Sequence, residues 1–191
     1  MKSSATHNTP FDDFTTDTLS KVLEASEGVT PVYVYSENYL RGQARALKEI
    51  FQAEEREARG LPECTIRYAM KAWSNVNVLR LFASEGLHFD CSSVYEVMRV
   101  IKAGVDPSQI ELASQELTKA QLDQLRKLPG SDKVLFIASS KQQLDTLRSD
   151  ALFSKQVAGI RVNPGFGSGY HSKTVVAGPK YSFGIWHENL D

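Results

Sequence analysis

The chain has 191 residues, of which 41% are hydrophobic, and its 22 basic side chains nearly balance 23 acidic ones. Such a balance gives no strong field that would recruit nucleic acid or an anionic membrane surface, so we expect neither partner. No apolar run approaches membrane-spanning length, and residues 1–30 lack the apolar core of a secretory signal, so we expect a cytoplasmic protein.

Residues 1–60 divide into two expected segments. Residues 1–30 form a polar leading segment with a short amphipathic stretch. Residues 31–60 carry a strand at residues 31–35 and then a helix, because apolar side chains recur at helical spacing from Leu40 onward.

From residue 61 to residue 191, short apolar runs alternate with helical patterns. The expected strands are residues 66–71, 87–91, 110–112, 134–137 and 159–162. Strict alternation of this kind predicts parallel βα units. Five such units fit an open doubly wound sheet or part of a (β/α)8 barrel, whereas a complete barrel needs about 250 residues.

The run IRYAMKAWSN, residues 66–75, places a lysine where a strand gives way to a helix start. On an extended strand Arg67, Ala69 and Lys71 share one face, and the small Ala69 leaves space below the amine. A lysine at the carboxyl end of a buried strand is usually held there by an acid or by its chemistry, which suits a Schiff-base lysine. The alternative is an ordinary lysine that extends its amine into solvent at a strand end.

Metal chemistry is not indicated. Cys64 and Cys91 are too few and too far apart for a zinc pattern, and a cytoplasmic chain keeps both thiols reduced. The four histidines stand at no metal-ligand spacing, so we expect no metal site.

Several segments together resemble the pyridoxal-phosphate decarboxylases of alanine racemase-like fold. They are TPVYVYSENYLRGQARALKEIF, IRYAMKAWSN, LHFDCSSVYEVMRVIKAGVDPSQIELAS and GIRVNPGFGSGYHSKTVVAGPKYSFGIW, in the order and spacing of that family. The YAMKA piece is shared across the family, whereas the long RVNPGFGSG, KT and GIW block looks most like the diaminopimelate decarboxylase branch. The resemblance extends over most of the chain.

The resemblance implies an α/β fold, namely a partial (β/α)8 TIM barrel that stops after about five strands. Residues 61–191 would form the N-terminal part of this barrel, and the strand at residues 31–35 would belong to the family's β-domain. The glycine turns for the cofactor phosphate and the glutamate facing the pyridine nitrogen would lie outside the chain. We therefore expect the isolated chain to bind pyridoxal phosphate weakly and to turn over little.

The resemblance also implies site residues. Lys71 matches the family's catalytic and cofactor-binding lysine, and Asp90 at the end of the next strand would hold its charge. Arg161 would lie near the cofactor's phenolic oxygen. From the residues alone, Asp90 also fits a helix-start acid, and Arg161 also fits a structural salt bridge.

Two further features carry alternatives. Glu96 forms an S-x-x-E capping box with Ser93, and a role in capping a helix accounts for the glutamate without an active site. The family, however, often has a glutamate at this position, near the lysine. Glycines at residues 165–169 do not have phosphate-cradle spacing, so we interpret residues 165–185 as a mobile loop over the substrate side.

The implied activity is the pyridoxal-phosphate-dependent release of carbon dioxide from meso-2,6-diaminopimelate, which gives L-lysine. A related decarboxylase acting on ornithine, arginine, carboxynorspermidine or a siderophore precursor is an alternative, and so is a non-catalytic barrel-derived binding module. The resemblance also implies a homodimer, because active sites in this family are built at a two-fold interface.

Overall fold

The computed structural model describes residues 11–51, 58–61, 64–171 and 174–190, and these fall into two compact units. The first unit contains the described residues up to Ile66 together with the turn Ser84–Gly86. The second unit contains Arg67–Ala83 and the described residues from Leu87 onward.

Two helices form most of the first unit. Helix α1 (Thr16–Ala25) begins after Thr15, whose hydroxyl accepts a hydrogen bond from the Thr18 amide. Helix α2 (Glu37–Phe51) buries Ala44 on its apolar side. The helix predicted from apolar spacing after Leu40 is therefore confirmed, and α1 contains the short amphipathic stretch expected in residues 1–30.

The strand predicted at residues 31–35 does not form. The segment between α1 and α2 carries no strand assignment, and no strand of the described residues forms a ladder with it. A β-branched and aromatic run favours an extended backbone, but only a neighbouring strand can complete its hydrogen bonds. This part of the fold prediction is wrong for the structure.

Glu85 ties the turn after α4 (Val76–Ser84) to α2 within the first unit. Its carboxylate accepts hydrogen bonds from Arg41 Nη1 and Arg45 Nε, each at 2.8 Å. Its carbonyl oxygen accepts a hydrogen bond from Lys48 Nζ at 2.9 Å. The guanidinium groups of Arg45 and Arg41 lower the pKa of Glu85 from 4.5 to about 2.

The lowered pKa of Glu85 leads us to expect that the stability of the protein depends on pH. The carboxylate contributes stability that is fully present above pH 4.5 and is lost as the pH falls towards 2. Glu85→Gln removes the titrating group, so we expect its thermal unfolding midpoint to fall less than that of the wild type over this interval. Parallel slopes for the two proteins between about pH 5 and pH 2 would contradict the assignment.

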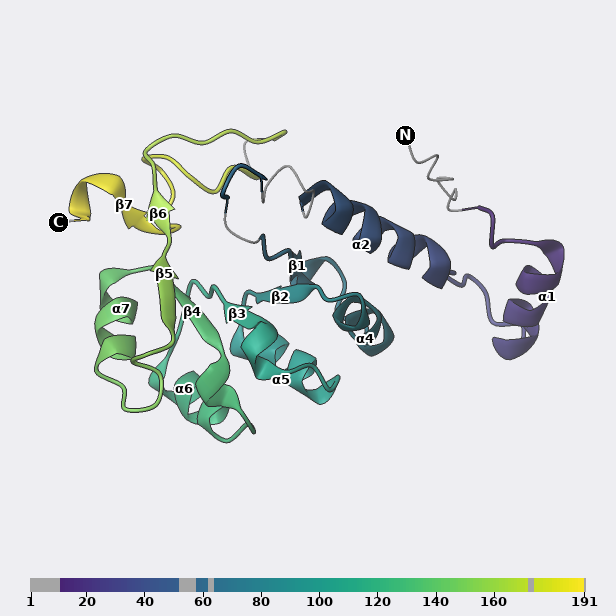
Figure 1. Ribbon diagram of the computed structural model, residues 1–191, viewed down its shortest axis with the longest axis horizontal. Coiled ribbons are helices and arrows are strands. Elements are labelled where there is room, and N and C mark those ends of the chain that lie inside the picture. Colours follow the sequence, from purple (N-terminus) through teal and green to yellow (C-terminus); the bar gives the residue numbers. More distant parts are fainter. Residues whose placement is uncertain (1–10, 52–57, 62–63, 172–173, 191) are drawn as a thin grey trace. The chain divides into compact units, whose positions relative to one another are not determined.

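The second unit is built on a parallel sheet of five strands. The strands are β1 (Arg67–Ala69), β2 (His88–Cys91), β3 (Ile110–Leu112), β4 (Leu135–Ala138) and β5 (Val157–Ile160). They lie in the order β1-β2-β3-β4-β5, so each strand pairs with its neighbour along the chain (Figure 1). The five predicted strands are all confirmed, β3 with its predicted bounds and the other four with shifted boundaries.

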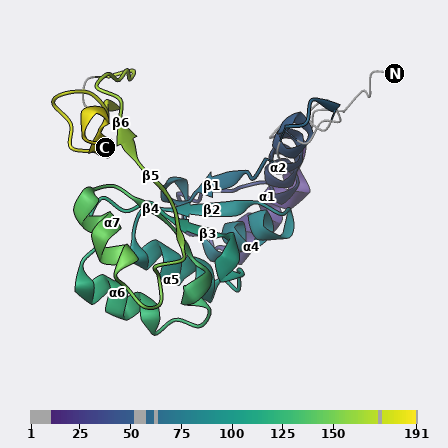
Figure 2. The ribbon, with the colours of Figure 1, turned by 60° about the vertical axis from the view of Figure 1, so that its left-hand side comes forward.

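Within the described residues of the second unit, helices cover one face of this sheet and leave the other open. Helices α5 (Val94–Lys102), α6 (Lys119–Arg126) and α7 (Lys141–Arg148) follow their strands and lie along the same face (Figure 2). Strand side chains that point to the helices are fully buried, namely Phe89, Cys91, Ile110, Leu112, Phe136 and Ala138. Side chains alternate along a strand, so the intervening residues lie on the opposite face.

The remaining elements are short. Strands β6 (Val162–Asn163) and β7 (Ile185–Trp186) form a small parallel sheet beyond β5. The 3-10 turns are η1 (Met70–Ala72), η2 (Pro107–Gln109), η3 (Ser131–Lys133) and η5 (His187–Asn189). Among the described residues, no helix is long and apolar enough to cross a membrane.

Candidate active site

Lys71 lies at the carboxyl end of β1, in the turn η1, with an exposed side chain. The sequence predicted that the strand itself runs to Lys71, and this boundary is wrong because the strand ends at Ala69. The Tyr68 hydroxyl donates a hydrogen bond to the Trp73 carbonyl at 3.0 Å. This bond spans the turn η1, in which Lys71 lies.

Aromatic packing holds the base of this turn. Tyr68 points to the helix side of the sheet, where its ring centroid lies 4.7 Å from that of Phe82 and 6.3 Å from that of Phe89. Burial raises the pKa of Tyr68, so its hydroxyl keeps its proton and remains a donor at neutral pH.

Asp90 lies on the open face of the sheet, in register with Ala69 of β1. Its Oδ1 atom is buried and makes no hydrogen bond to the described part of the chain. Burial and then the nearby Glu111 raise the pKa of Asp90, whereas Lys71 and Arg67 oppose this shift. A buried carboxylate oxygen without a partner is an acceptor available for a cationic or hydrogen-bonding group.

Glu96 caps helix α5. The Ser93 hydroxyl accepts a hydrogen bond from the Glu96 amide at 3.3 Å, and the Glu96 carboxylate accepts one from the Ser92 amide at 2.7 Å. The predicted capping role is confirmed, although the returning bond reaches one residue before the N-cap. A role for Glu96 towards the cofactor stays a prediction.

Replacing the N-cap serine tests this local structure. Ser93→Ala removes the acceptor for the Glu96 amide, so we expect the free energy of unfolding to fall by about 1 kcal/mol. Glu96→Gln keeps an acceptor for the Ser92 amide and should change stability by less than about 0.5 kcal/mol. Chemical denaturation of both variants measures the difference, and a larger loss in Glu96→Gln would assign the glutamate a role beyond capping.

Arg161 lies between β5 and β6, and its amide extends the ladder to the Ala138 carbonyl at 2.8 Å. Its guanidinium carbon stands 4.9 Å from the ring centroid of Phe183, which is a cation-π distance. The structure therefore gives Arg161 an aromatic neighbour from the segment before β7. Its predicted contact with the cofactor stays a prediction.

Asn163 was missed by the sequence analysis. Its buried side chain makes four hydrogen bonds, donating to the Gly178 and Tyr181 carbonyls and accepting from the Gly165 and Gly178 amides. The segment interpreted from the sequence as a mobile loop is thus tied to β6 by one side chain. A polar residue that ends a strand before proline and glycines was the available signal.

Three other side chains were also missed as a group. Arg67 on β1 donates to Glu111 on β3 at 2.8 Å, and its Nη1 lies 3.2 Å from His88 Nδ1 on β2. Their contact depends on the register of three strands, which the sequence pattern does not supply.

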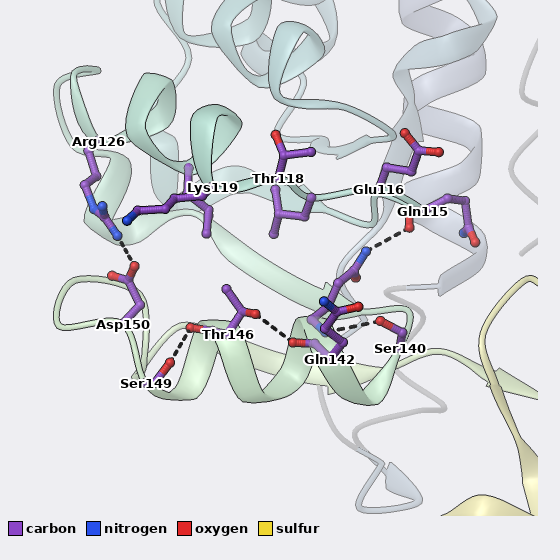
Figure 3. Close-up of a pocket in the computed structure, with 13 residues that line it drawn as sticks. Gln115, Glu116, Thr118, Lys119, Arg126, Ser140, Gln142, Thr146, Ser149 and Asp150 are labelled. Atoms are coloured by element: carbon purple, nitrogen blue, oxygen red, sulfur yellow. Dashed lines mark hydrogen bonds and ion pairs between the residues drawn. The ribbon is translucent and has the colours of Figure 1, made fainter.

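A groove of about 850 Å³ lies elsewhere, between helices α6 and α7 (Figure 3). Most of the residues that line it are of polar types, with Arg126 paired to Asp150 at one end. At the other end the Gln143 side chain donates to the Gln115 carbonyl at 2.8 Å. None of the predicted site residues lines this groove, so it is separate from the candidate active site.

The fold and the lysine site define a class of protein. A lysine at the carboxyl ends of parallel βα strands, where barrel enzymes place their active sites, beside a buried carboxylate, suits an enzyme that holds a carbonyl compound through its amine. No group of three metal-ligating side chains occurs in the described ranges.

The chain belongs to the pyridoxal-dependent decarboxylases, because residues 47–191 match the pyridoxal binding domain of that family. The cofactor of this family is pyridoxal 5'-phosphate. Lys71 is an exposed amine of the kind that such a cofactor requires, and the buried Oδ1 of Asp90, which has no hydrogen-bond partner among the described residues, suits a cationic group.

Curated relatives are named diaminopimelate decarboxylase. The protein from Streptomyces coelicolor is 33% identical over 171 residues, which cover 87% of this chain and 34% of that protein. The protein from Escherichia coli strain K12 is 30% identical over 164 residues, which cover 84% of this chain and 34% of that protein. The chain therefore spans about a third of the length of the curated relatives that it matches.

Solved structures share the fold. Diaminopimelate decarboxylase from Helicobacter pylori, complexed with L-lysine, superposes with a TM-score of 0.68 at 23% identity, covering 89% of this chain and 40% of that chain. Another diaminopimelate decarboxylase structure gives a TM-score of 0.65 at 28% identity, covering 93% of this chain and 38% of that chain. The five-stranded sheet is the N-terminal part of the alanine racemase-like barrel, as the sequence predicted.

Proposed function

We propose that this chain supplies the cofactor-binding lysine of a decarboxylase that converts meso-2,6-diaminopimelate to L-lysine. The observation that carries the proposal is the position of Lys71 at the carboxyl end of β1, in the family's pyridoxal binding domain. The names of the most similar curated relatives support the choice of substrate.

The side chains have distinct proposed roles. Pyridoxal phosphate, when bound, supplies the electron-accepting ring that a decarboxylation requires. Lys71 holds the cofactor through its amine, and the carboxylate of Asp90 stabilises positive charge on that amine. Arg161 supplies a fixed cation near the cofactor, with its guanidinium oriented by Phe183. Glu96 orders the start of α5 and adds negative charge near Asp90.

Chemical trapping tests the proposal directly. The chain is incubated with pyridoxal phosphate, reduced with borohydride and digested, and the modified peptide is identified by mass spectrometry. We expect the pyridoxyl group on Lys71. Modification of another lysine, or of none, contradicts the proposal.

A substrate panel tests the specificity. Carbon dioxide release is measured with meso-diaminopimelate, ornithine, arginine and lysine, using the chain and the longest protein that contains it. The highest kcat/KM with meso-diaminopimelate supports the proposed substrate. A preference for ornithine or arginine would keep the decarboxylase class and replace the substrate.

We also propose that the protein acts as a cytoplasmic homodimer, as the family resemblance implies. Light scattering on the purified protein measures the mass in solution. A monomer that remains fully active would contradict the dimer.

A further inference from the structure

The open face of the sheet carries a row of charged side chains below the lysine turn. Arg67 and His88 are partners in the register of β1 and β2, and Asp90 and Glu111 are partners in the register of β2 and β3. Residues paired across parallel strands point to the same side, so these four side chains share one surface. Nothing in the lysine chemistry described above uses Arg67, His88 or Glu111.

Arg67 bridges the outer two of these three strands. Its Nε atom donates to Glu111 Oε2 at 2.8 Å, and only 24% and 19% of the two side chains are exposed. Its Nη1 atom lies 3.2 Å from His88 Nδ1. A guanidinium can only donate, so His88 Nδ1 is the acceptor in this contact. The guanidinium is therefore committed to two partners.

Asp90 lies between this pair and Lys71. Its neighbour across the ladder is Glu111, and its Oδ1 atom accepts no hydrogen bond from the described residues. The charged groups that act on it are Glu111 from β3, Lys71 from η1, Glu96 from α5 and Arg67 from β1, and His88 lies two residues before it on the same face of β2. Two cations, Lys71 and Arg67, are thus candidates for one carboxylate.

The structure shows which cation is engaged elsewhere. Arg67 donates to Glu111 and His88, and none of its hydrogen bonds reaches Asp90. We propose that Glu111 is a positioning residue for the active site, because it holds the Arg67 guanidinium away from Asp90 and so leaves the Asp90 carboxylate for Lys71. This inference rests on the proposed function, in which Lys71 holds the cofactor.

The proposal predicts opposite effects for the two members of the pair. Glu111→Gln removes a negative charge and frees Arg67 to approach Asp90, so the Lys71 ammonium is less stabilised and loses its proton more easily. Arg67→Gln leaves Glu111 unpaired beside Asp90, so the ammonium is more stabilised. In the double variant both positions are neutral, so their summed charge is zero, as it is for the ion pair of the wild type. The proton affinity of Lys71 should therefore resemble that of the wild type.

The experiment measures how trapping depends on pH. Wild type, Glu111→Gln, Arg67→Gln and the double variant are treated with pyridoxal phosphate and borohydride across a pH series, and the pyridoxyl group on Lys71 is quantified by mass spectrometry. The midpoint is the pH at which trapping on Lys71 is half of its maximum. We expect this midpoint to move down by about half a pH unit in Glu111→Gln, which is about a threefold gain in trapping below the midpoint. It should move up by a similar amount in Arg67→Gln.

Two controls separate this role from a structural one. Arg126→Gln breaks the two ion pairs of Arg126, with Asp123 and Asp150, away from the site, and should leave the midpoint unchanged. If either single glutamine variant fails to fold by circular dichroism, the swapped variant Arg67→Glu with Glu111→Arg keeps an ion pair and places the cation beside Asp90. Its midpoint should move down, as in Glu111→Gln.

The outcomes distinguish the two proposals. Absence of trapping on Lys71 in the wild type overturns the proposed function. Trapping on Lys71 with equal midpoints in all variants, or with shifts of the same sign in both single variants, overturns the role of Glu111 and leaves the proposed function standing. Opposite shifts that cancel in the double variant support the positioning role.

Discussion

Lys71→Ala is expected to abolish the yellow absorbance that the protein acquires with pyridoxal phosphate near neutral pH. The substitution removes the only amine of the turn η1, and alanine offers no nucleophile in its place. In the longest protein that contains the chain, decarboxylation should fall by about a thousandfold or more. Absorbance spectra and carbon dioxide release measure the two effects.

Lys102→Ala is the matched control for this substitution. Lys102 lies in the last turn of α5 and is exposed, so its loss removes one lysine without touching the site. This variant should keep the yellow band and the borohydride-trapped peptide. A band that persists in Lys71→Ala, or that disappears in Lys102→Ala, would show that another lysine holds the cofactor.

Asn163→Asp is expected to destabilise the second unit by about 3 kcal/mol at neutral pH. The aspartate can still accept from the Gly165 and Gly178 amides, but its carboxylate then faces the Gly178 and Tyr181 carbonyls without a proton to donate. The loss should shrink at low pH, because a protonated carboxyl regains one donor.

Chemical denaturation at two pH values measures this effect. Asn189→Asp is the matched control, since Asn189 is exposed in the turn η5 and the same change there should alter stability by less than about 0.5 kcal/mol. Equal and small losses for the two substitutions would show that the four hydrogen bonds of Asn163 do not hold the loop.

The sheet was predictable because its signals are local. β3 coincides with its predicted strand, and the alternation of short apolar runs with helical spacing is enough to order the βα units. The same logic failed at residues 31–35, where a good extended segment has no strand beside it in the described residues. Strand propensity describes a segment, whereas a strand requires a partner.

The candidate site was predictable in its composition and less so in its geometry. The motif around Lys71 predicts a cofactor amine, and that role stays a prediction. The turn that carries Lys71 depends on a hydrogen bond from the Tyr68 side chain to the Trp73 backbone carbonyl, which the motif does not encode. Glu111 contacts Arg67 across 44 positions of sequence, through a register that no single strand encodes. Contacts of this kind follow from tertiary structure.

The order of the strands has a consequence for how this sheet assembles. Every ladder joins strands that are consecutive in the chain, and Phe89 pairs with Ile110 after a single intervening helix. Closing such short loops costs little entropy, and low contact order is associated with rapid folding. During synthesis each new strand therefore meets a partner that has already left the ribosome, so the sheet can grow from β1 towards β5 without waiting for distant sequence.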